Sequence, residues 1–503
     1  MKVWAGERDM RRGRPGATLR ARALAVVAAA LALSLALAGC ASIDPPSHPA
    51  ANLVPTAAPQ TTGGAETNPE RKRLIDAFGG EYSAPAVERY LNDILSRLAQ
   101  ASDTPSEPYR VTILDSPVVN AFALPTGEIF ITRGLLTLAN DSSEVAAVMA
   151  HEIAHVTARH AAQRAELEKT AQLFTRVSDQ VLDRPQEGEA VQARMQLSIA
   201  RFSRQQEFEA DQIGIGVIAK AGFDPYAASR FLTSLGRWSA LRTAMIGAGS
   251  ADKPDMMATH PSTPERVAQA VVEAHKFGAP GVGETGRDEY LNIVDGIAYG
   301  DNPAQGLVRG VRFLHPKLGF AFQAPDGFTL ENQSAALIGV GEGGAQALRL
   351  DSIALSPSTS LEDELASGWI DGVKTSSIEA LPGGDYPMAI AVAQGDQWSF
   401  RLGAVRVGDR VFRLIFAAHS LTPAVDARFR VAIRSFHRLR PEEAAEAQAS
   451  RLRVVEAQAG DTADSMAQRM SPEERAVGQF LVLNSLDREG PLVAGQRYKI
   501  IAP

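Results

Sequence analysis

The spacing of apolar residues predicts a helix followed by two strands in the first third of the chain. Between residues 84 and 101, apolar side chains recur every three or four positions, as on one face of an amphipathic helix. The runs 109–114 and 128–132 are short and rich in β-branched and aromatic residues, which predicts strands. Between them, Pro125-Thr126-Gly127 predicts a turn.

A longer helical stretch follows. Asp141 is a suitable N-cap, with Glu144 three residues later in the capping-box position, and apolar spacing continues the helix to about Arg164. Helical spacing then fills residues 165–240, except at Ala221–Pro225, where a glycine followed by a proline predicts the end of a helix.

Length and composition predict several folded units. At ~150 residues per domain, 503 residues are enough for about three units plus tails. Apolar residues make up 45% of the chain and charged residues 22%, which is typical of globular proteins. From residue 309 to 440 the pattern changes to short strand-like runs followed by a helix, and the residues after 453 predict a small separate unit.

Charge and hydropathy at the start of the chain predict secretion. The first 39 residues carry seven basic and two acidic side chains, a net charge of +5. Because the whole chain has a formal net charge of −7, residues 40–503 carry −12, which argues against nucleic acid as a partner. An apolar run from Ala23 to Gly39 follows the basic start, as in a secretory signal. A transmembrane anchor is the alternative, but the run is shorter than the ~20 residues that span a bilayer.

The apolar run ends in Leu37-Ala38-Gly39-Cys40, and Cys40 is the only cysteine, so no disulfide can form within the chain. This tetrad resembles the lipobox of bacterial lipoproteins, which implies lipidation of Cys40 and attachment to a membrane. Ala41 is not the aspartate that resembles an inner-membrane retention signal, so we expect attachment to the outer membrane, facing the periplasm. Residues 41–68, rich in Pro, Ala, Thr and Gly, predict a flexible tether.

The sequence His151-Glu152-Ile153-Ala154-His155 lies in the helix predicted to begin at Asp141. Histidines four residues apart share a helical face, so both imidazoles can reach one metal ion, and Glu152 beside them can hold and deprotonate water. Zinc suits hydrolysis because it polarises a carbonyl and brings the pKa of bound water to about 7. With nine histidines in the chain, the motif should arise by chance on the order of once in a hundred such chains, so context must support it.

A catalytic zinc needs a third protein ligand. Glu207 and Asp211 lie four residues apart on one face of a predicted helix, where Glu207 can bind the metal and Asp211 can support it or donate a proton. Taken alone, such a charged run is more often a solvated helix face. Together with the paired histidines, it predicts one zinc ion per chain, held by His151, His155 and Glu207.

These motifs, HExxH followed by ExxAD, resemble peptidase family M48, the gluzincin family of HtpX, BepA and the CAAX prenyl endopeptidases. Three further segments resemble the family's pattern: Asn120–Leu135 before the metal helix, Ala221–Pro225 after the third ligand, and the His-Pro segment His260–Arg266. The resemblance spans about residues 70–275. It implies an α+β chain whose peptidase part is a mainly helical zincin domain with a small β-sheet.

The resemblance keeps the three predicted zinc ligands and makes Glu152 the general base, with Asp211 as a supporting acid. His260 would lie near the metal, since in BepA-like relatives the corresponding histidine can take the open metal position and keep the enzyme latent. Arg266 would support the transition state or pair with a nearby carboxylate. His160, five residues after the second motif histidine, would lie off the ligand face of the predicted helix, either at the surface or behind a metal ligand.

The last third of the chain resembles two accessory modules. Residues 309–440 resemble PsbP-like α/β domains, on the start Gly319–Phe328 and a strand-rich middle. The end resembles a LysM-like module on Val454–Thr462 and Ala494–Ile500, and such modules often bind peptidoglycan, here through residues 445–503. The predicted boundaries are a signal peptide at 1–39, a tether at 40–68, the peptidase domain at 69–285, a linker at 286–308, the α/β domain at 309–440 and the LysM-like module at 441–503.

The sequence therefore predicts a zinc-dependent endopeptidase of the cell envelope that cuts protein or peptide substrates in protein quality control. An extended substrate would add as a β-strand beside Glu128–Thr132. The chain lacks the membrane helices of HtpX and the 34-residue helical repeat of BepA, which favours misfolded envelope proteins over prenylated peptides as substrates. Two alternatives remain: an assembly factor that mainly binds, with latent or secondary proteolysis, and a peptidoglycan-tethered scaffold with a vestigial site.

Overall fold

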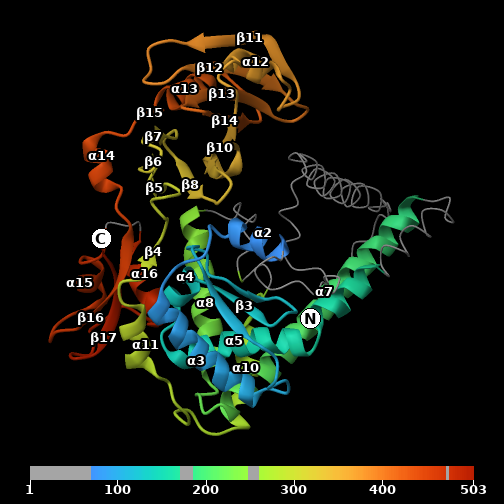
Figure 1. The fold of residues 1–503 in the computed structure, drawn as a ribbon, viewed down its shortest axis with the longest axis vertical. Helices are drawn as coiled ribbons and strands as arrows, with labels where there is room; N and C mark the ends of the chain where they lie inside the picture. The colour runs from blue at the N-terminus through green and yellow to red at the C-terminus, as the bar shows by residue number, and fades with distance from the viewer. Residues whose placement is uncertain (1–68, 170–184, 247–255, 257–259, 472–474, 503) are drawn as a thin grey trace, which may run out of the picture. The chain divides into compact units, whose positions relative to one another are not determined.

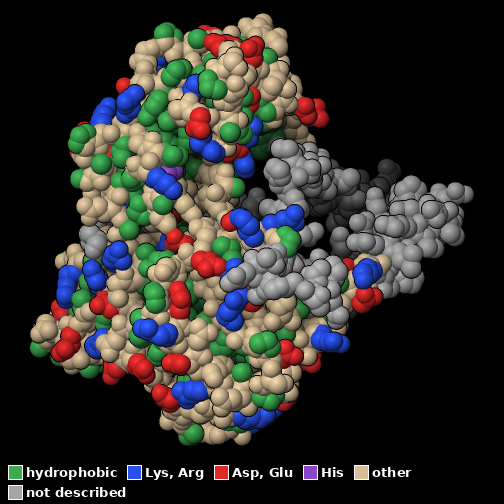
Figure 2. All heavy atoms as spheres, in the orientation of Figure 1, with side chains coloured by type: hydrophobic (Ala, Val, Ile, Leu, Met, Phe, Trp, Pro, Cys, Tyr) green, Lys and Arg blue, Asp and Glu red, His purple; other side chains and the backbone are tan. Residues whose placement is uncertain are grey.

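The computed structural model describes residues 69–169, 185–246, 256, 260–471 and 475–502 (Figure 1). The predicted signal peptide, Cys40 and the predicted tether lie outside the described residues. Within the described ranges, no helix combines the length and the apolar character that crossing a membrane requires. Basic and acidic side chains are interspersed on the face seen in Figure 2, where neither sign forms a single large patch.

A small sheet accompanies the helices of the predicted peptidase part. β1 (Arg110–Leu114) and β3 (Glu128–Thr132) run parallel, and β2 (Ala121–Ala123) pairs antiparallel with β3, giving the order β1-β3-β2. The expectation that a substrate adds beside β3 is therefore wrong, because β1 and β2 already take both edges of that strand. Among the described residues, the outer edge of β2 carries no further strand of this sheet, so another strand could add there.

Helix α5 (Ser142–Thr157) carries the HExxH motif and begins as predicted. The Asp141 carboxylate accepts a hydrogen bond from the Glu144 amide at 2.8 Å, and the Glu144 carboxylate accepts one from the Asn140 amide, also at 2.8 Å. Every residue from 142 to 154 is buried, so α5 is surrounded by protein on all sides. Such a helix can hold polar side chains away from bulk water.

The end of α5 differs from the prediction, which extended the helix to about Arg164. The helix ends at Thr157, residues 158–159 form a turn, and a new helix occupies residues 160–169. Arg159 has a φ of 57°, a left-handed conformation that L-residues other than glycine adopt at a cost. The chain therefore changes direction between the metal-binding motif and the residues that follow it.

Other helices pack around α5 and the small sheet. They are α2 (Pro69–Ala77), α3 (Pro85–Ala101), α4 (Arg133–Leu138), α7 (Pro185–Lys220), α8 (Ala227–Ile246) and α10 (Pro264–His275). Helix α7 lies close against α5 at Gly214, where a Cβ atom would lie 3.1 Å from the His151 backbone nitrogen. The absence of a side chain at this position lets the two helices meet backbone to backbone.

Residues 309–440 contain a seven-stranded sheet of order β11-β12-β13-β14-β10-β9-β8, in which every pairing is antiparallel. α13 (Pro423–Arg434) packs on one face and α12 (Leu361–Ala366) on the other, since successive residues of β12 belong to different hydrophobic clusters. A second sheet has the order β15-β7-β6-β5. The strand bounds are β5 (Leu307–Arg309), β6 (Arg312–His315), β7 (Phe320–Gln323), β8 (Phe328–Asn332), β9 (Leu337–Gly341), β10 (Gln346–Ala354), β11 (Val373–Leu381), β12 (Met388–Gln394), β13 (Ser399–Val407), β14 (Arg410–Ala418) and β15 (His437–Arg438).

The C-terminal residues do not form the separate unit that the sequence predicted. β16 (Ser450–Glu456) pairs with β17 (Arg497–Ala502) on one side and with β4 (Ala298–Tyr299), from the predicted linker, on the other. Leu452 and Phe480 belong to the same hydrophobic cluster as the core of α5. The remaining elements are α11 (Arg287–Val294), α14 (Pro441–Glu446), α15 (Ala463–Ala467) and α16 (Ala476–Leu483).

A buried lysine strengthens this junction. The Lys499 side chain is fully buried, and its Nζ donates hydrogen bonds of 2.8, 3.0 and 2.6 Å to the carbonyls of Thr137, Leu138 and Ala139. These carbonyls lie at the end of α4, where a helix leaves its last C=O groups without partners. The C-terminal module thus completes the hydrogen bonding of a helix in the peptidase part.

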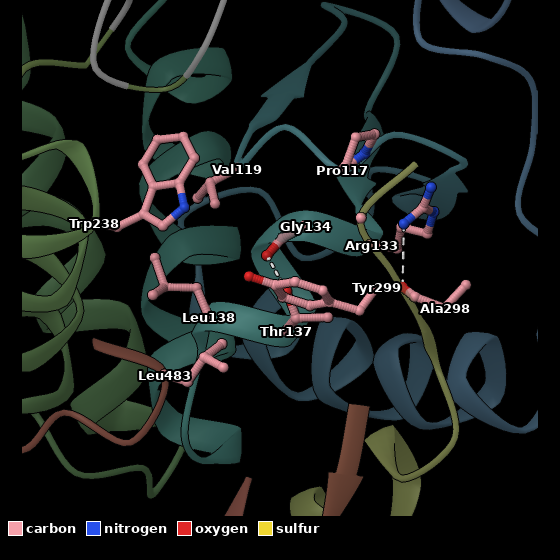
Figure 3. A pocket seen from close by; sticks show the side chains of 11 residues that line it. Pro117, Val119, Arg133, Gly134, Thr137, Leu138, Trp238, Ala298, Tyr299 and Leu483 are labelled. Atoms are coloured by element: carbon pink, nitrogen blue, oxygen red, sulfur yellow. Dashed lines mark hydrogen bonds between the residues drawn. The ribbon is translucent and has the colours of Figure 1, made fainter. Parts of the chain in front are cut away.

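A cavity of about 140 Å³ lies at the same junction (Figure 3). Its walls come from α4, from Trp238 of α8, from Tyr299 of β4 and from Leu483 of α16. At one side, the Arg133 guanidinium donates a hydrogen bond to the Ala298 carbonyl, as Figure 3 shows. None of the predicted metal ligands lines this cavity.

Candidate metal centre

Four side chains from separate parts of the chain converge on one point. His151 and His155 come from α5, Glu207 from α7, and His260 from the residues before α10. Each offers one ligand atom, and the four atoms lie within 4.8 Å of one another. The structure thus brings together the three predicted ligands and the histidine that was expected nearby.

Five separations between ligand atoms of this cluster lie close to those around a tetrahedral zinc ion, although the four atoms spread over as much as 4.8 Å. The His151 Nε2 atom lies 3.0 Å from His155 Nε2 and 3.2 Å from His260 Nδ1. The Glu207 carboxylate oxygens lie 3.5, 3.4 and 3.0 Å from the ligand nitrogens of these three histidines in turn. Bonds of about 2.0–2.1 Å to a tetrahedral ion place ligand atoms roughly 3.3–3.4 Å apart.

Hydrogen bonds alone account poorly for this arrangement. The His151 Nε2 atom faces three acceptor-capable atoms, but a ring nitrogen carries at most one proton. A cation at the centre would satisfy all four lone pairs at once. Imidazole and carboxylate ligands are also the set that zinc binds in proteins, so the residues present fit the ion that the motif implies.

Helix geometry and a close helix contact position these groups. His151 and His155 are one turn apart on α5, and Glu207 and Asp211 are one turn apart on α7. Gly214 continues the Glu207–Asp211 stripe, and its close approach to the His151 backbone holds the two helices together. Gly214 was not among the predicted site residues, although a glycine inside a helix, seven residues after a predicted ligand, was a usable signal.

A buried chain of charges supports the cluster from one side. The His151 Nδ1 atom lies 2.9 Å from the Asp211 carboxylate, which accepts two hydrogen bonds of 2.8 Å from the Arg266 guanidinium. Arg266 also lies 3.0 Å from Glu207. Burial lowers the pKa of His151, but the carboxylates of Asp211 and Glu207 outweigh that effect and raise it to about 10. Arg266 therefore pairs with carboxylates, the simpler of the two roles expected for it.

Glu152 lies beside the cluster with one oxygen available. Its side chain is only 3% exposed, and its Oε1 atom is buried without a hydrogen-bond partner among the described residues. The same oxygen lies 3.7 Å from the His260 Nε2 atom. Burial raises the pKa of Glu152 above its usual value, while the nearby imidazoles of His260 and His151 lower it. The backbone of Ala123, in the edge strand β2, hydrogen bonds to this carboxylate.

The residues before α10 also reach the open edge of the small sheet. The Met256 amide donates a 3.1 Å hydrogen bond to the Val119 carbonyl, and the Met256 side chain is buried in the core. The His260 amide in turn donates to the Met256 carbonyl at 2.6 Å. The Met256 backbone thus links His260 to the backbone leading into β2. Nothing in the sequence pattern around Met256 indicated this contact.

His160 was expected off the ligand face, either at the surface or behind a metal ligand, and the structure places it behind a ligand rather than at the surface. Its Nδ1 atom lies 2.8 Å from the Nδ1 atom of His155, and its side chain is 1% exposed. The expectation assumed a continuous helix, whereas the left-handed turn at Arg159 redirects the chain and returns His160 toward the cluster.

Comparisons with known proteins agree with this geometry. Residues 85–274 match the model of peptidase family M48, and this range includes all four residues of the cluster. The chain is 32% identical over 216 residues to the beta-barrel assembly-enhancing protease of Escherichia coli K12, covering 41% of this chain and 42% of that protein. It is 35% identical over 159 residues to the mitochondrial metalloendopeptidase OMA1 of Arabidopsis thaliana, covering 31% of this chain and 30% of that protein.

The chain thus spans less than half the length of these relatives. Among solved structures, the solution structure of cyanobacterial PsbP from Synechocystis covers 25% of this chain and 91% of its own, with 12% identity and a TM-score of 0.22. A likeness this low carries no argument about the fold of residues 309–440. The PsbP-like and LysM-like assignments stay predictions.

Proposed function

We propose that this chain, whose residues 85–274 form a peptidase domain of family M48, is a zinc-dependent endopeptidase. The observation that carries the proposal is the convergence of His151, His155, Glu207 and His260 beside the buried carboxylate of Glu152. Every residue of the cluster is a histidine or a glutamate. Its three imidazoles and one carboxylate are typical zinc ligands.

The roles follow from the contacts of each residue. His151, His155 and Glu207 would hold a zinc ion, which when bound would supply Lewis acidity to polarise the scissile carbonyl and lower the pKa of water. Glu152 takes the proton from water through its unpartnered oxygen and delivers it to the leaving amine. The Asp211 carboxylate lies 2.9 Å from His151 Nδ1, where it would orient that ring with its Nε2 lone pair toward the metal.

The outer edge of β2 is the proposed binding edge for an extended substrate. No further strand of the described chain pairs with it in this sheet, and the Ala123 backbone contacts the Glu152 carboxylate, so a peptide on this edge would pass beside the general base. Backbone hydrogen bonding to an edge strand accepts many sequences, because main-chain groups are common to all of them. This suits a peptidase that acts on misfolded or misassembled proteins.

The described conformation corresponds to a latent state. His260 takes the fourth position of the cluster, where water must enter, and Met256 pairs with the lead-in to the substrate edge. Both contacts must be released before hydrolysis, because a zinc with four protein ligands has no open position. This observation also favours the second candidate function, an envelope assembly factor that mainly binds proteins and cuts them only when His260 leaves this position.

The cellular setting is proposed from the sequence and the relatives. The basic and apolar start, Cys40 and the tether support a lipid-anchored protein of the periplasm, attached to the outer membrane and engaged in protein quality control. Similarity to a beta-barrel assembly-enhancing protease supports envelope proteins as substrates. Peptidoglycan binding through residues 445–503 is best tested by sedimentation of the full chain with peptidoglycan, since these residues share a core with the peptidase part.

Metal analysis and casein cleavage test the proposal together. We expect about one zinc per chain in the wild type, Glu152→Gln and His260→Ala. Casein cleavage should be slow in the wild type, absent in Glu152→Gln and faster in His260→Ala, which opens the fourth position. A wild-type chain without zinc would refute the endopeptidase proposal. Equal cleavage by wild type and His260→Ala would refute the latent state alone.

A further inference from the structure

His160 forms the second hydrogen-bond chain that leads away from the metal cluster. The first runs from His151 through Asp211 to Arg266. The second starts at the other ligand of α5, because the Nδ1 atom of His155 lies 2.8 Å from that of His160. The two rings meet edge to face, with their centroids 4.8 Å apart and their planes at 77°. Each histidine of the HExxH motif thus has a partner on its far nitrogen.

The direction of the hydrogen bond between His155 and His160 follows from the protonation of the His155 Nε2 atom, which faces the cluster. The Nε2 atom of His155 faces His151 Nε2 and Glu207, so with zinc bound it must be free of a proton. The proton of neutral His155 is then on Nδ1, where it needs an acceptor. His160 Nδ1 is that acceptor, which puts its own proton on Nε2, and Nε2 faces the Glu209 carboxylate at 3.4 Å. All three groups then have matching donors and acceptors.

Several contacts hold His160 in this position. Its side chain is buried, and its carbonyl accepts a 3.1 Å hydrogen bond from the Gln206 side chain, next in sequence to the ligand Glu207. The left-handed conformation of Arg159 is what turns the ring back toward the cluster. A non-glycine residue in this conformation persists where the surrounding structure requires it, and such positions gather at functional sites.

We propose that His160 is a positioning residue, which accepts the Nδ1 proton of His155 and thereby presents the Nε2 lone pair of that ligand to the metal. The inference rests on the proposed function, since it concerns the same zinc site. Partners of this kind fix the tautomer and orientation of a metal-binding imidazole, and their loss typically lowers metal affinity by 10- to 100-fold.

Two amide substitutions separate this role from simple packing. In His160→Asn, the side-chain oxygen can take the place of Nδ1 and still accept the proton of His155. In His160→Gln, the longer side chain places its polar group near the position of Nε2, so the His155 proton loses its acceptor. Glutamine matches the size of histidine better than asparagine does. A merely structural role would therefore favour His160→Gln, whereas the proposed role favours His160→Asn.

The measurement is the zinc dissociation constant of the full chain, from competition with a chromophoric chelator, together with the melting temperature of each metal-free variant. We expect His160→Asn to bind zinc within about threefold of wild type and His160→Gln to bind it on the order of 10-fold or more weakly. His419→Leu, a change of a histidine in the accessory domain, is the control and should leave zinc affinity unchanged. Unaltered melting temperatures of the metal-free variants would show that folding is not the cause.

The failures are distinguishable. Zinc binding by the wild type with equal affinities of His160→Asn and His160→Gln would overturn the positioning role and leave the proposed function standing. A loss of affinity in both variants that matches a drop in their metal-free melting temperatures would also overturn it. A wild type that binds no zinc would instead overturn the proposed function.

Discussion

Replacement of Gly214 by alanine should weaken the metal centre although it favours the helix. A Cβ atom at this position would lie 3.1 Å from the His151 nitrogen and 3.3 Å from both the Ala150 carbonyl carbon and the His151 Cα. All three are backbone atoms of α5, which cannot rotate away as a side chain would. The helix α7 must therefore move back by a few tenths of an ångström, and it carries Glu207 with it.

Two opposed terms set the magnitude for Gly214→Ala. Alanine in place of glycine inside a helix stabilises by roughly 0.5–1 kcal/mol. Overpacking against a backbone that cannot relax costs about 1–3 kcal/mol. Gly216, two residues later on α7, is a matched control, because its Cβ would meet only the Phe277 ring at an ordinary 3.6 Å. Subtracting the effect of Gly216→Ala removes the propensity term and leaves the contact with α5.

Urea unfolding of the metal-free chain and zinc titration measure these effects. Gly216→Ala should be as stable as wild type or more so, and Gly214→Ala should be about 1–3 kcal/mol less stable than Gly216→Ala. Zinc affinity should fall in Gly214→Ala only, because only that change shifts Glu207 relative to the histidines of α5. Equal stabilities and equal zinc affinities of the two alanine variants would refute the close contact as a determinant of the site.

Three further predictions concern two residues beside the metal cluster and the buried Lys499. Arg159→Gly should raise the free energy of unfolding by about 1 kcal/mol, because glycine adopts the left-handed conformation without strain. A lower free energy of unfolding in urea titrations of the variant would contradict this. Asp211→Asn should lower zinc affinity on the order of 10-fold in chelator competition, because an amide oxygen is a weaker acceptor for His151 than a carboxylate; unchanged affinity would argue against its support role. Burial lowers the pKa of Lys499 to about 7 from 10.5, so above pH 7 the unfolded chain holds a proton that the folded chain has lost, and stability should rise with pH by up to roughly 1.4 kcal/mol per unit. In Lys499→Met, the free energy of unfolding should no longer rise between pH 7 and 9. Urea unfolding of wild type and variant across this range checks this, and equal slopes of unfolding free energy against pH would show that the lysine is not responsible.

Much of the site could be predicted because helix periodicity is a local property. Two histidines four residues apart must share a face, and so must Glu207 and Asp211, wherever the helices lie. The start of α5 was equally predictable, since the Asp141–Glu144 cap depends only on neighbouring residues. The end of α5 was not, because residues 157–160 contain no glycine or proline to mark the turn.

The fold predictions failed where distant segments compete for the same partner. The residues of β3 predicted a strand correctly, but which strand forms an edge depends on pairing with residues elsewhere in the chain. The C-terminal module was predicted to be separate because its sequence resembles a small LysM-like module. Its apolar residues nevertheless join the core of the peptidase part, and Lys499 binds carbonyls more than 350 residues away in sequence.

The candidate zinc ligands could be identified from short stretches of the chain, because ligand type and helical spacing are local properties. The meeting of α5 and α7 at Gly214, the place of His260 in the cluster and the return of His160 to His155 arise from the packing of distant segments. These outcomes depend on the packing of helices and on one left-handed residue, and neither leaves a periodic signal in the chain.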